Sequence, residues 1–433
     1  MAVTRLRMDF TPLRQSRDYR LLFFSGVITY LGSMITYVAL PFQVAHLTDS
    51  FLAVGLIGLV EIAPLIIFGL YGGSLADSID RRIMVLTTEF SALILVAVLL
   101  VNALLPEPQL WVLYVIAVLL AANSGLQRPS LDAMTPRLVP HDQLAAAGAL
   151  NTIKWNLGSI VGPAIGGLLL SAGGAASAYA FDVVSFAVSF LLLWRLRALR
   201  PLTDTTEKPT LHHIVEGMRY AASRRDLLGT YAVDLIAMVF AFPYALFPFL
   251  AVELGAPWAL GLLYAASAAG GLLVTCTSGW VPRINHHGRA VVFGALLWGA
   301  GMALVGVTQS LWFVLFFLAV AGAGDMVSGI FRGLIWNQTI PDEMRGRMAG
   351  IEMLSYSIGP QLGQVRSSAA ASLTNLRMSF VSGGVMCIVG VALAAFTMPS
   401  LWRYDTRTSV DSQRESMIRK FPADDPSSHD DDV

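Results

Sequence analysis

The sequence predicts an all-α polytopic membrane protein in which twelve transmembrane helices form two six-helix halves. Three observations lead to this fold class. The first is composition: 55% of the residues are hydrophobic and only 13% are charged, whereas a soluble domain usually carries about 25% charged residues. The second is a series of apolar stretches long enough to cross a bilayer. The third is a glycine–proline pattern that occurs once in each half of the chain.

The apolar stretches divide the chain into five regions. Stretches of about 20 residues, the length that spans a bilayer, lie at 21–47, 54–76, 83–105, 110–133, 144–170, 179–194, 227–252, 259–281, 290–307, 311–336, 348–373 and 378–398. One long polar connection separates the first six from the last six. The predicted regions are an N-terminal arm (1–20), a first half (21–194), a linker (195–226), a second half (227–398) and a tail (399–433). The polar tail is expected to be disordered from Trp402 onward.

Lysine and arginine residues predict how the helices are oriented. They gather in the N-terminal arm, in the linker and in alternate connections, such as those with Arg81 and Arg82 or with Arg283. The remaining connections lack them, and Arg377 is the exception. Because positively charged loops stay in the cytoplasm, both termini are predicted to be cytoplasmic, and the protein is expected in the cell (inner) membrane.

A glycine-rich pattern marks the fifth span. The segment NLGSIVGPAIGGL (156–168) contains Gly158, Gly162, Pro163, Gly166 and Gly167. Glycines four residues apart lie on one helix face and let a neighbouring helix approach closely. The segment SIGPQLGQ (357–364) repeats the glycine–proline pair and the following glycine in the eleventh span. Two such helices at equivalent positions predict two related halves.

The connection after the second span carries another pattern. Its sequence, GGSLADSIDRR (72–82), includes Gly73, Asp77, Arg81 and Arg82. One interpretation is a cytoplasmic loop in which the aspartate caps a helix and the arginines set the orientation. The pattern also resembles the signature loop of the major facilitator superfamily, although Asp80 stands where that signature usually has glycine. The resemblance implies that these residues form a gate that holds the cytoplasmic side shut in one state.

Other segments extend this resemblance. The fifth-span glycines resemble the antiporter motif of proton-coupled drug exporters, which are linked to multidrug resistance. The segments NALLPEP (102–108) and ALFPFLA (245–251) resemble the siderophore exporters of the superfamily. The resemblance implies a secondary active efflux transporter that works by alternating access and proton antiport. Its cargo would be a siderophore-like or amphipathic drug-like small molecule.

Four ionisable residues lie well inside predicted spans: Glu61, Lys154, Asp234 and Asp325. A charge inside a membrane is expensive, so each is a candidate for substrate binding or proton coupling. Lys154 is expected to neutralise an anionic cargo. Structural alternatives stay open for all four. Glu61 and Lys154 could form an ion pair, and Asp325 could bridge helices together with Arg332, which shares its helix face.

Aromatic residues near these charges are candidates for lining an amphipathic cavity between the halves. They are Trp155, Phe240, Phe242, Tyr244, Phe247 and Tyr264. Ordinary helix packing is the alternative interpretation for each ring. Pro243 and Pro248 are expected to break the seventh helix. Arg128, Asp182 and Arg366 lie near the ends of spans, where snorkelling toward the interface explains a charge.

The sequence argues against several other classes of protein. The net charge is zero, so there is no footprint for nucleic acid. No G-x-x-x-x-G-K-[ST] loop and no H-E-x-x-H motif occur, which argues against ATP as the energy source and against a metalloenzyme. We therefore expect no enzyme, no metal and no cofactor, with the proton gradient as the energy source. A secondary importer of the same fold stays open, and a membrane-embedded enzyme or sensor is less favoured. The expected partners are the lipid bilayer, a small-molecule substrate and protons, and the chain is expected to be monomeric.

Overall fold

The computed structural model describes residues 9–197, 224–340 and 345–407, without the side chains of Leu70, Gly73, Ser74, 76–78, Arg225 and 345–356. Within these ranges all regular structure is helical, which confirms the predicted all-α fold. The predicted linker and the predicted tail lie largely outside the described residues.

The first half consists of α2 to α6, with a short helix before it. Its elements are α1 (Thr11–Gln15), α2 (Arg17–Thr48), α3 (Phe51–Ser78), α4 (Arg81–Leu104), α5 (Leu110–Leu138), η1 (His141–Gln143) and α6 (Leu144–Trp194). Ser16 and Ser50 cap the N-termini of α2 and α3 with their hydroxyl groups. α6 contains two spans, because Gly173 and Gly174 leave helical geometry. Gly174 has a φ of 64°, which glycine adopts without strain.

The second half consists of α8 to α14. Its elements are α8 (Arg225–Ala241), η2 (Tyr244–Leu246), α9 (Phe247–Glu253), η3 (Pro257–Ala259), α10 (Leu260–Cys276), η4 (Ser278–Arg283), α11 (His287–Val307), α12 (Leu311–Thr339), α13 (Arg345–Leu373), α14 (Leu376–Thr397) and α15 (Pro399–Trp402). The seventh span is broken at the predicted place, since α8 ends just before Pro243 and α9 resumes with Pro248 in its first turn. A proline is tolerated there because its missing N–H has no partner in a first helical turn.

Ten helical segments of the described chain are long and apolar enough to cross a membrane. Two further spans complete the predicted set. α6 counts once among the ten although it crosses twice. α13 is less apolar because it carries Gln361, Gln364 and Arg366. With these two, the described residues contain the twelve predicted transmembrane helices.

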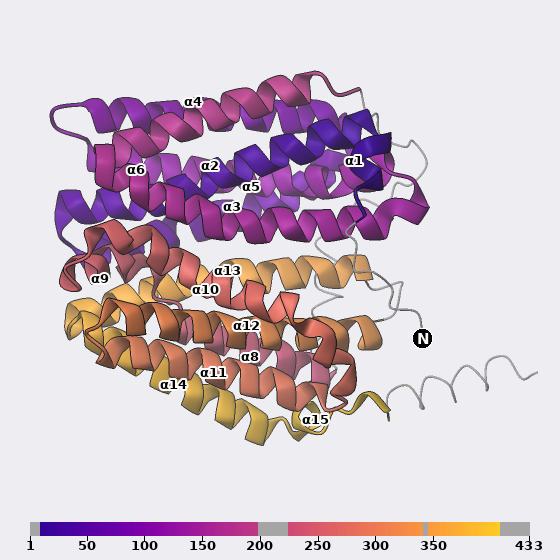
Figure 1. Cartoon of the computed structure of the whole chain (residues 1–433), viewed down its shortest axis with the longest axis vertical. Coiled ribbons are helices and arrows are strands. Elements are labelled where there is room, and N and C mark those ends of the chain that lie inside the picture. The colour runs from indigo at the N-terminus through magenta and orange to yellow at the C-terminus, as the bar shows by residue number, and fades with distance from the viewer. Residues whose placement is uncertain (1–8, 198–223, 341–344, 408–433) are drawn as a thin grey trace, which may run out of the picture.

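The two halves form two helix bundles that lie side by side (Figure 1). They meet where α3 packs against α13 and where α6 packs against α10. α1 and α15 lie at one end of the molecule, and α9 lies at the opposite end (Figure 1). We call these the terminal end and the α9 end.

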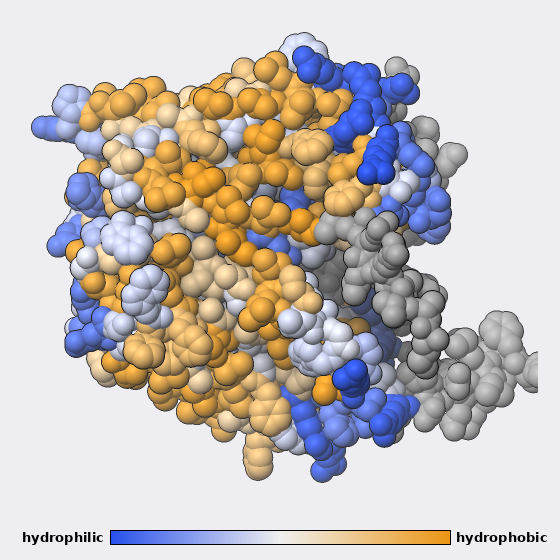
Figure 2. Space-filling view, viewed as in Figure 1, coloured by the Kyte–Doolittle hydropathy of each residue, from blue (hydrophilic) through white to orange (hydrophobic). Residues whose placement is uncertain are grey.

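The surface has the pattern of a membrane protein. Apolar residues cover the middle of the molecule, and hydrophilic residues gather toward the two ends (Figure 2). Large apolar side chains point outward from several helices, as Trp312 does with 71% of its surface exposed. Such a continuous apolar belt is unfavourable in water and matches the hydrocarbon core of a bilayer. The chain is therefore a multi-pass membrane protein.

The glycine patterns pack in the same way in both halves. A Cβ added to Gly162 on α6 would lie 2.5 Å from Met34 Cβ on α2, and a Cβ added to the equivalent Gly359 on α13 would lie 2.9 Å from Met238 Cβ on α8. The fifth helix therefore contacts the first as the eleventh contacts the seventh. This equivalence confirms the predicted repeat and explains why glycine occupies these positions.

The halves touch each other closely toward the α9 end. A Cβ on Gly261 of α10 would lie 2.2 Å from the Pro163 carbonyl oxygen of α6. The rings of Phe51 and Phe249 have centroids 4.6 Å apart, and those of Tyr37 and Tyr264 are 5.9 Å apart. Backbone and aromatic contacts thus hold the two halves together at this end.

The beginning of the tail is ordered, which corrects the expectation of disorder from Trp402 onward. The Tyr404 hydroxyl donates to Gln338 at 3.1 Å, and the Thr406 backbone N–H donates to the Asn285 carbonyl at 3.0 Å. These contacts hold residues up to Arg407 against α11 and α12. The prediction failed because polar composition does not show whether a segment finds partners on a neighbouring helix.

Candidate functional site

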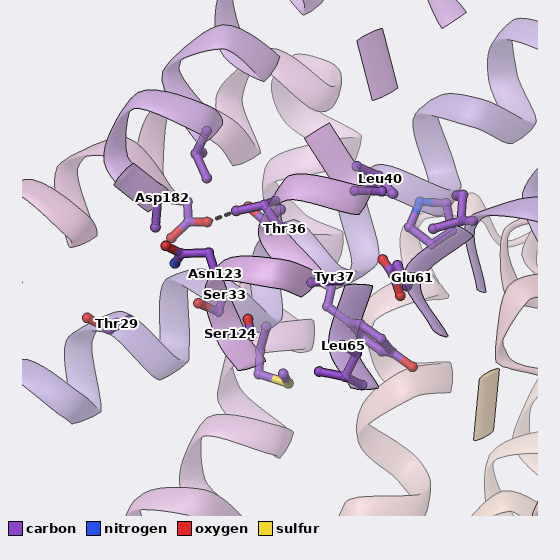
Figure 3. Close-up of a pocket in the computed structure, with 18 of the residues that line it drawn as sticks. Thr29, Ser33, Thr36, Tyr37, Leu40, Glu61, Leu65, Asn123, Ser124 and Asp182 are labelled. Carbon is purple, nitrogen blue, oxygen red and sulfur yellow. Dashed lines mark hydrogen bonds between the residues drawn. The ribbon is translucent and has the colours of Figure 1, made fainter. Parts of the chain in front are cut away.

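A cavity of about 270 Å³ lies inside the first half. Side chains from α2 to α6 surround it, and Gln361 and Gln364 of α13 contribute from the other half. Figure 3 shows Glu61, Asn123 and Asp182 around this space. A largely apolar cavity that contains a few carboxylate, hydroxyl and amide groups and touches both halves is a natural place for a transporter to bind a ligand or an ion.

Glu61 connects the two halves. Its Oε2 accepts a hydrogen bond of 2.8 Å from Nε2 of Gln361, whose Oε1 in turn accepts one of 3.0 Å from Gln364. Glu61 therefore lies at the contact between α3 and α13. The ion pair with Lys154 that the sequence left open is not formed, because neither residue takes part in an ion pair within the described chain.

Asp182 is fully buried, with 0% of its surface exposed. It accepts hydrogen bonds of 2.5 Å from the Thr36 hydroxyl of α2 and 2.8 Å from the Ser185 hydroxyl one turn later. The explanation by snorkelling is therefore wrong for this residue. The predicted sixth span begins close to Asp182, whereas the second part of α6 begins earlier, right after Gly174, so the carboxylate lies deeper than the sequence indicated.

Glu89 on α4 is a second buried carboxylate, and 2% of it is exposed. It accepts hydrogen bonds from the Thr29 and Ser189 hydroxyl groups and one of 2.7 Å from the Gln127 amide. Glu89 was not among the site residues predicted from the sequence. The signal was present, because a glutamate inside the third apolar span is itself an expensive charge.

In the second half, Arg332 and the buried Asp234 form an ion pair. Arg332 on α12 forms an ion pair with Asp234 of α8, and its Nη2 lies 3.9 Å from Asp325 Oδ1. Asp234 is 3% exposed, whereas the side chain of Asp325 is 42% exposed. The prediction that Asp325 and Arg332 share a helix face is confirmed. The structure adds Asp234 to this group, which we call the Arg332 cluster.

Arg366 of α13 is also more buried than snorkelling predicts. Its Nη1 donates to the Ser379 carbonyl oxygen at 3.4 Å, and the guanidinium lies against Gly383 of α14. In the described part of the chain, its Nε and Nη2 have no hydrogen-bond partner. The arginine is thus held inside the second half and does not reach the interface.

Lys154 and Trp155 lie on the first part of α6, nearer the terminal end. The Lys154 ammonium is 5.3 Å from the centroid of the Trp155 ring, and the Tyr30 ring stands edge-on to that ring at 4.2 Å. Tyr30 and Ser159 share a hydrogen bond of 2.9 Å. Trp155 is 42% exposed. A cation beside accessible aromatic rings can bind an anionic aromatic molecule.

Arg128 of α5 is exposed and lines a smaller pocket with Ser357 of α13.

The aromatic residues of the broken seventh span pack against each other. The Tyr264 hydroxyl donates to the Tyr244 carbonyl oxygen at 2.9 Å, and the rings of Tyr244 and Phe247 are 4.7 Å apart. Phe247 and Tyr264 are buried. These two rings therefore pack inside the protein and do not line an open cavity. For them the proposed cavity lining is corrected, and the alternative of ordinary helix packing is supported. Phe242 joins the same group, 4.1 Å from Tyr244.

The predicted gating loop is described only in part. Gly73 and Asp77 lie in the last turns of α3, where the side chains are outside the described residues. Arg81 donates to the Ala133 carbonyl oxygen at 3.2 Å, and Arg82 donates to that of Trp194 at 2.5 Å. The two arginines therefore connect α4 with the ends of α5 and α6. The gating role stays a prediction.

No group of three or more His, Cys, Asp or Glu residues in the described ranges could hold a metal ion.

Comparisons with known proteins identify the type of molecule. A family model described as transmembrane secretion effector matches residues 8–420. The enterobactin exporter EntS of Shigella boydii serotype 18 is 29% identical over 391 residues, which cover 89% of this chain and 93% of that protein. EntS of Escherichia coli O81 matches to the same extent.

Solved transporters share the fold. A POT family transporter in complex with 5-aminolevulinic acid superimposes with a TM-score of 0.72 at 15% identity, over 91% of this chain and 98% of that one. A bacterial homologue of the iron transporter ferroportin, in an inward-facing state, gives a TM-score of 0.65 at 17% identity, over 89% of this chain and 98% of that one. At this level of identity the likeness shows the fold alone.

Proposed function

We propose an export function for this chain, which belongs to the transmembrane secretion effector family of the major facilitator superfamily. The cargo would be a siderophore-like or amphipathic drug-like small molecule. The observation that carries the proposal is the 29% identity to the enterobactin exporter over 89% of the chain. The secondary importer, which the sequence alone left open, is disfavoured because these relatives are named as exporters.

The contact with the cargo is proposed at Lys154 and Trp155. An ammonium group next to two aromatic rings suits a molecule that is both aromatic and anionic, such as a catecholate. The ammonium would offset the negative charge, and the rings of Tyr30 and Trp155 would pack against the apolar part of the cargo.

Transport would proceed by alternating access driven by proton antiport. The contacts at the α9 end include Gly261 against Pro163 and Phe51 against Phe249, and they would separate when the protein opens on that side. The hydrogen bond between Glu61 and Gln361 lies in the same interface and would have to break. Asp77, Arg81 and Arg82 would hold the terminal end shut in the opposite state. We further propose that both termini are cytoplasmic and that one chain is the functional unit.

Transport into inverted vesicles under a set pH gradient tests this function. The panel would contain a catecholate siderophore, a hydroxamate siderophore, a cationic dye and a tetracycline-like drug. We expect catecholate uptake that stops when the gradient is collapsed. Uptake that ignores the gradient would contradict proton antiport, and no uptake of any compound by folded protein would contradict export.

Replacing the proposed cargo contact sharpens this test. Lys154→Met should lower catecholate uptake about 10- to 100-fold, since a charge-assisted contact contributes roughly 1.5–3 kcal/mol, and should leave dye uptake unchanged. Lys154→Arg keeps the charge and is the matched control. Equal loss for the anionic and cationic compounds would show that Lys154 is structural.

A further inference from the structure

The cavity of the first half contains an unusual set of acids. Glu61 and Asp182 line it, and Glu89 lies next to it, bonded to the lining residues Thr29 and Gln127. None of the three carboxylates forms an ion pair within the described ranges. Three uncompensated negative charges inside a membrane protein are strongly unfavourable, so a positive charge or a proton must reach them.

Asn123 provides a second, independent sign of a ligand. Its side chain is 8% exposed, lines the same cavity and has no hydrogen-bond partner among the described residues. Figure 3 shows it next to Asp182. An amide that faces a cavity without a protein partner can be satisfied by a water molecule there. A water molecule or hydronium ion in a cavity of about 270 Å³ would bind both groups.

We propose that this cavity is a proton-binding site, with Asp182 as the residue that takes up the proton and Glu89 as its neighbour. Asp182 is held by two hydroxyl groups, from Thr36 and Ser185, and a hydroxyl can donate to the ionised acid or accept from the protonated one. The site can therefore keep its geometry in both charge states. A site built around an arginine could not.

The groups that face Asp182 are few. α4 contributes Glu89, whose negative charge acts on Asp182 through space, and α6 itself contributes Tyr179, whose hydroxyl donates to Gln43 at 2.8 Å. α2 and α5 contribute the uncharged Thr36 and Asn123. No positively charged side chain of the described residues pairs with Asp182, so a proton or a cation from outside this set has to offset its charge.

The same cavity reaches the contact between the halves. Glu61 lines it and accepts the hydrogen bond of Gln361 from α13. A proton that enters at Asp182 therefore changes the charge of a space that borders the interface. The link between this change of charge and transport rests on the proposed transport function, whereas proton binding itself does not.

Infrared difference spectroscopy of the purified full-length chain between high and low pH tests proton binding without any cargo. We expect a carbonyl band of a protonated carboxylic acid that is lost in Asp182→Asn and kept in Glu107→Gln, an exposed loop control. Thr36→Val retains the acid and removes one hydroxyl partner, so the band should shift in frequency. If Asp182→Asn fails to fold, the frequency shift in Thr36→Val still tests whether the band belongs to Asp182.

Two results would overturn the proposal. One is a band that persists in Asp182→Asn and in Glu89→Gln. The other is a thermal midpoint that rises with Na⁺ at fixed pH and loses this response in Asp182→Asn, because the site would then bind Na⁺. If the band behaves as expected but no compound is transported, the proton site stands and the proposed export function fails.

Discussion

The two halves share their helix packing but bury their charged groups differently. In the second half, Asp234 is paired with Arg332, which also approaches Asp325. In the first half, Glu89 and Asp182 are held by hydroxyl and amide groups without an ion pair in the described chain. A carboxylate next to an arginine keeps its charge, whereas one held by hydroxyl groups can gain or lose a proton at little structural cost.

This difference assigns separate tasks to the two halves. The ion pair of Arg332 with Asp234 is suited to holding α8 and α12 together. The cavity of the first half has a charge that can change, and it borders the interface through Glu61 and Gln361. The repeat thus supplies a common scaffold of helix contacts, and its polar residues have diverged.

The largest effect is expected when the Arg332 cluster is broken. Arg332→Gln leaves Asp234 buried without its cation, which should destabilise the protein by about 3–5 kcal/mol. Thermal unfolding in detergent measures the loss. The double variant with Asp234→Asn removes both charges and should recover a large part of the stability. If Arg332→Gln alone unfolds at the wild-type temperature, the pair does not stabilise the second half.

A matched pair of glycine substitutions compares the packing of the two halves. Gly363→Ala places a Cβ 2.2 Å from the Met238 carbonyl oxygen, whereas Gly166→Ala places it 3.4 Å from Ile35 Cα, at the edge of ordinary contact. Overpacking usually costs about 1–3 kcal/mol, so Gly363→Ala should lower the unfolding temperature and Gly166→Ala should have little effect. Equal effects would show that the backbone adjusts similarly in both halves.

Much of the fold could be predicted from the sequence, because the features that determine it are local. Span length and the prolines 243 and 248 each act within one helix. The repeated glycine pattern is local as well. Its contacts with Met34 and Met238 follow once two equivalent helices are placed beside their neighbours.

The candidate site was harder to predict, because burial depends on partners that are distant in the sequence. Asp182 was assigned to a span end, and only the contact with Thr36 of α2 shows that it is buried. The sequence indicated that Arg332 shares a helix face with Asp325. It did not indicate that Arg332 forms an ion pair with Asp234 of α8. The sequence identifies charges inside spans, but it does not show which of them are neutralised and by what.

The smallest effect on stability is expected at Glu61, where the two halves meet. Glu61→Gln removes the charge but retains an amide that can exchange a hydrogen bond with Gln361, so the free energy of unfolding should change by less than about 1 kcal/mol. Gln361→Leu removes the only hydrogen bond to Glu61 among the described residues and leaves the half-buried carboxylate without it, which should cost about 1 kcal/mol or more.

Comparing the stability losses of Glu61→Gln and Gln361→Leu shows whether Glu61 contributes through a hydrogen bond that an amide can replace or through its negative charge. If Glu61→Gln is the more destabilising variant, the negative charge itself stabilises the interface, and the carboxylate has a partner that compensates it as Arg332 compensates Asp234. The first half would then resemble the second. If Glu61→Gln is nearly neutral while its transport loses the dependence on the pH gradient, the charge is needed for coupling and not for folding, which is the distinction that separates the two halves.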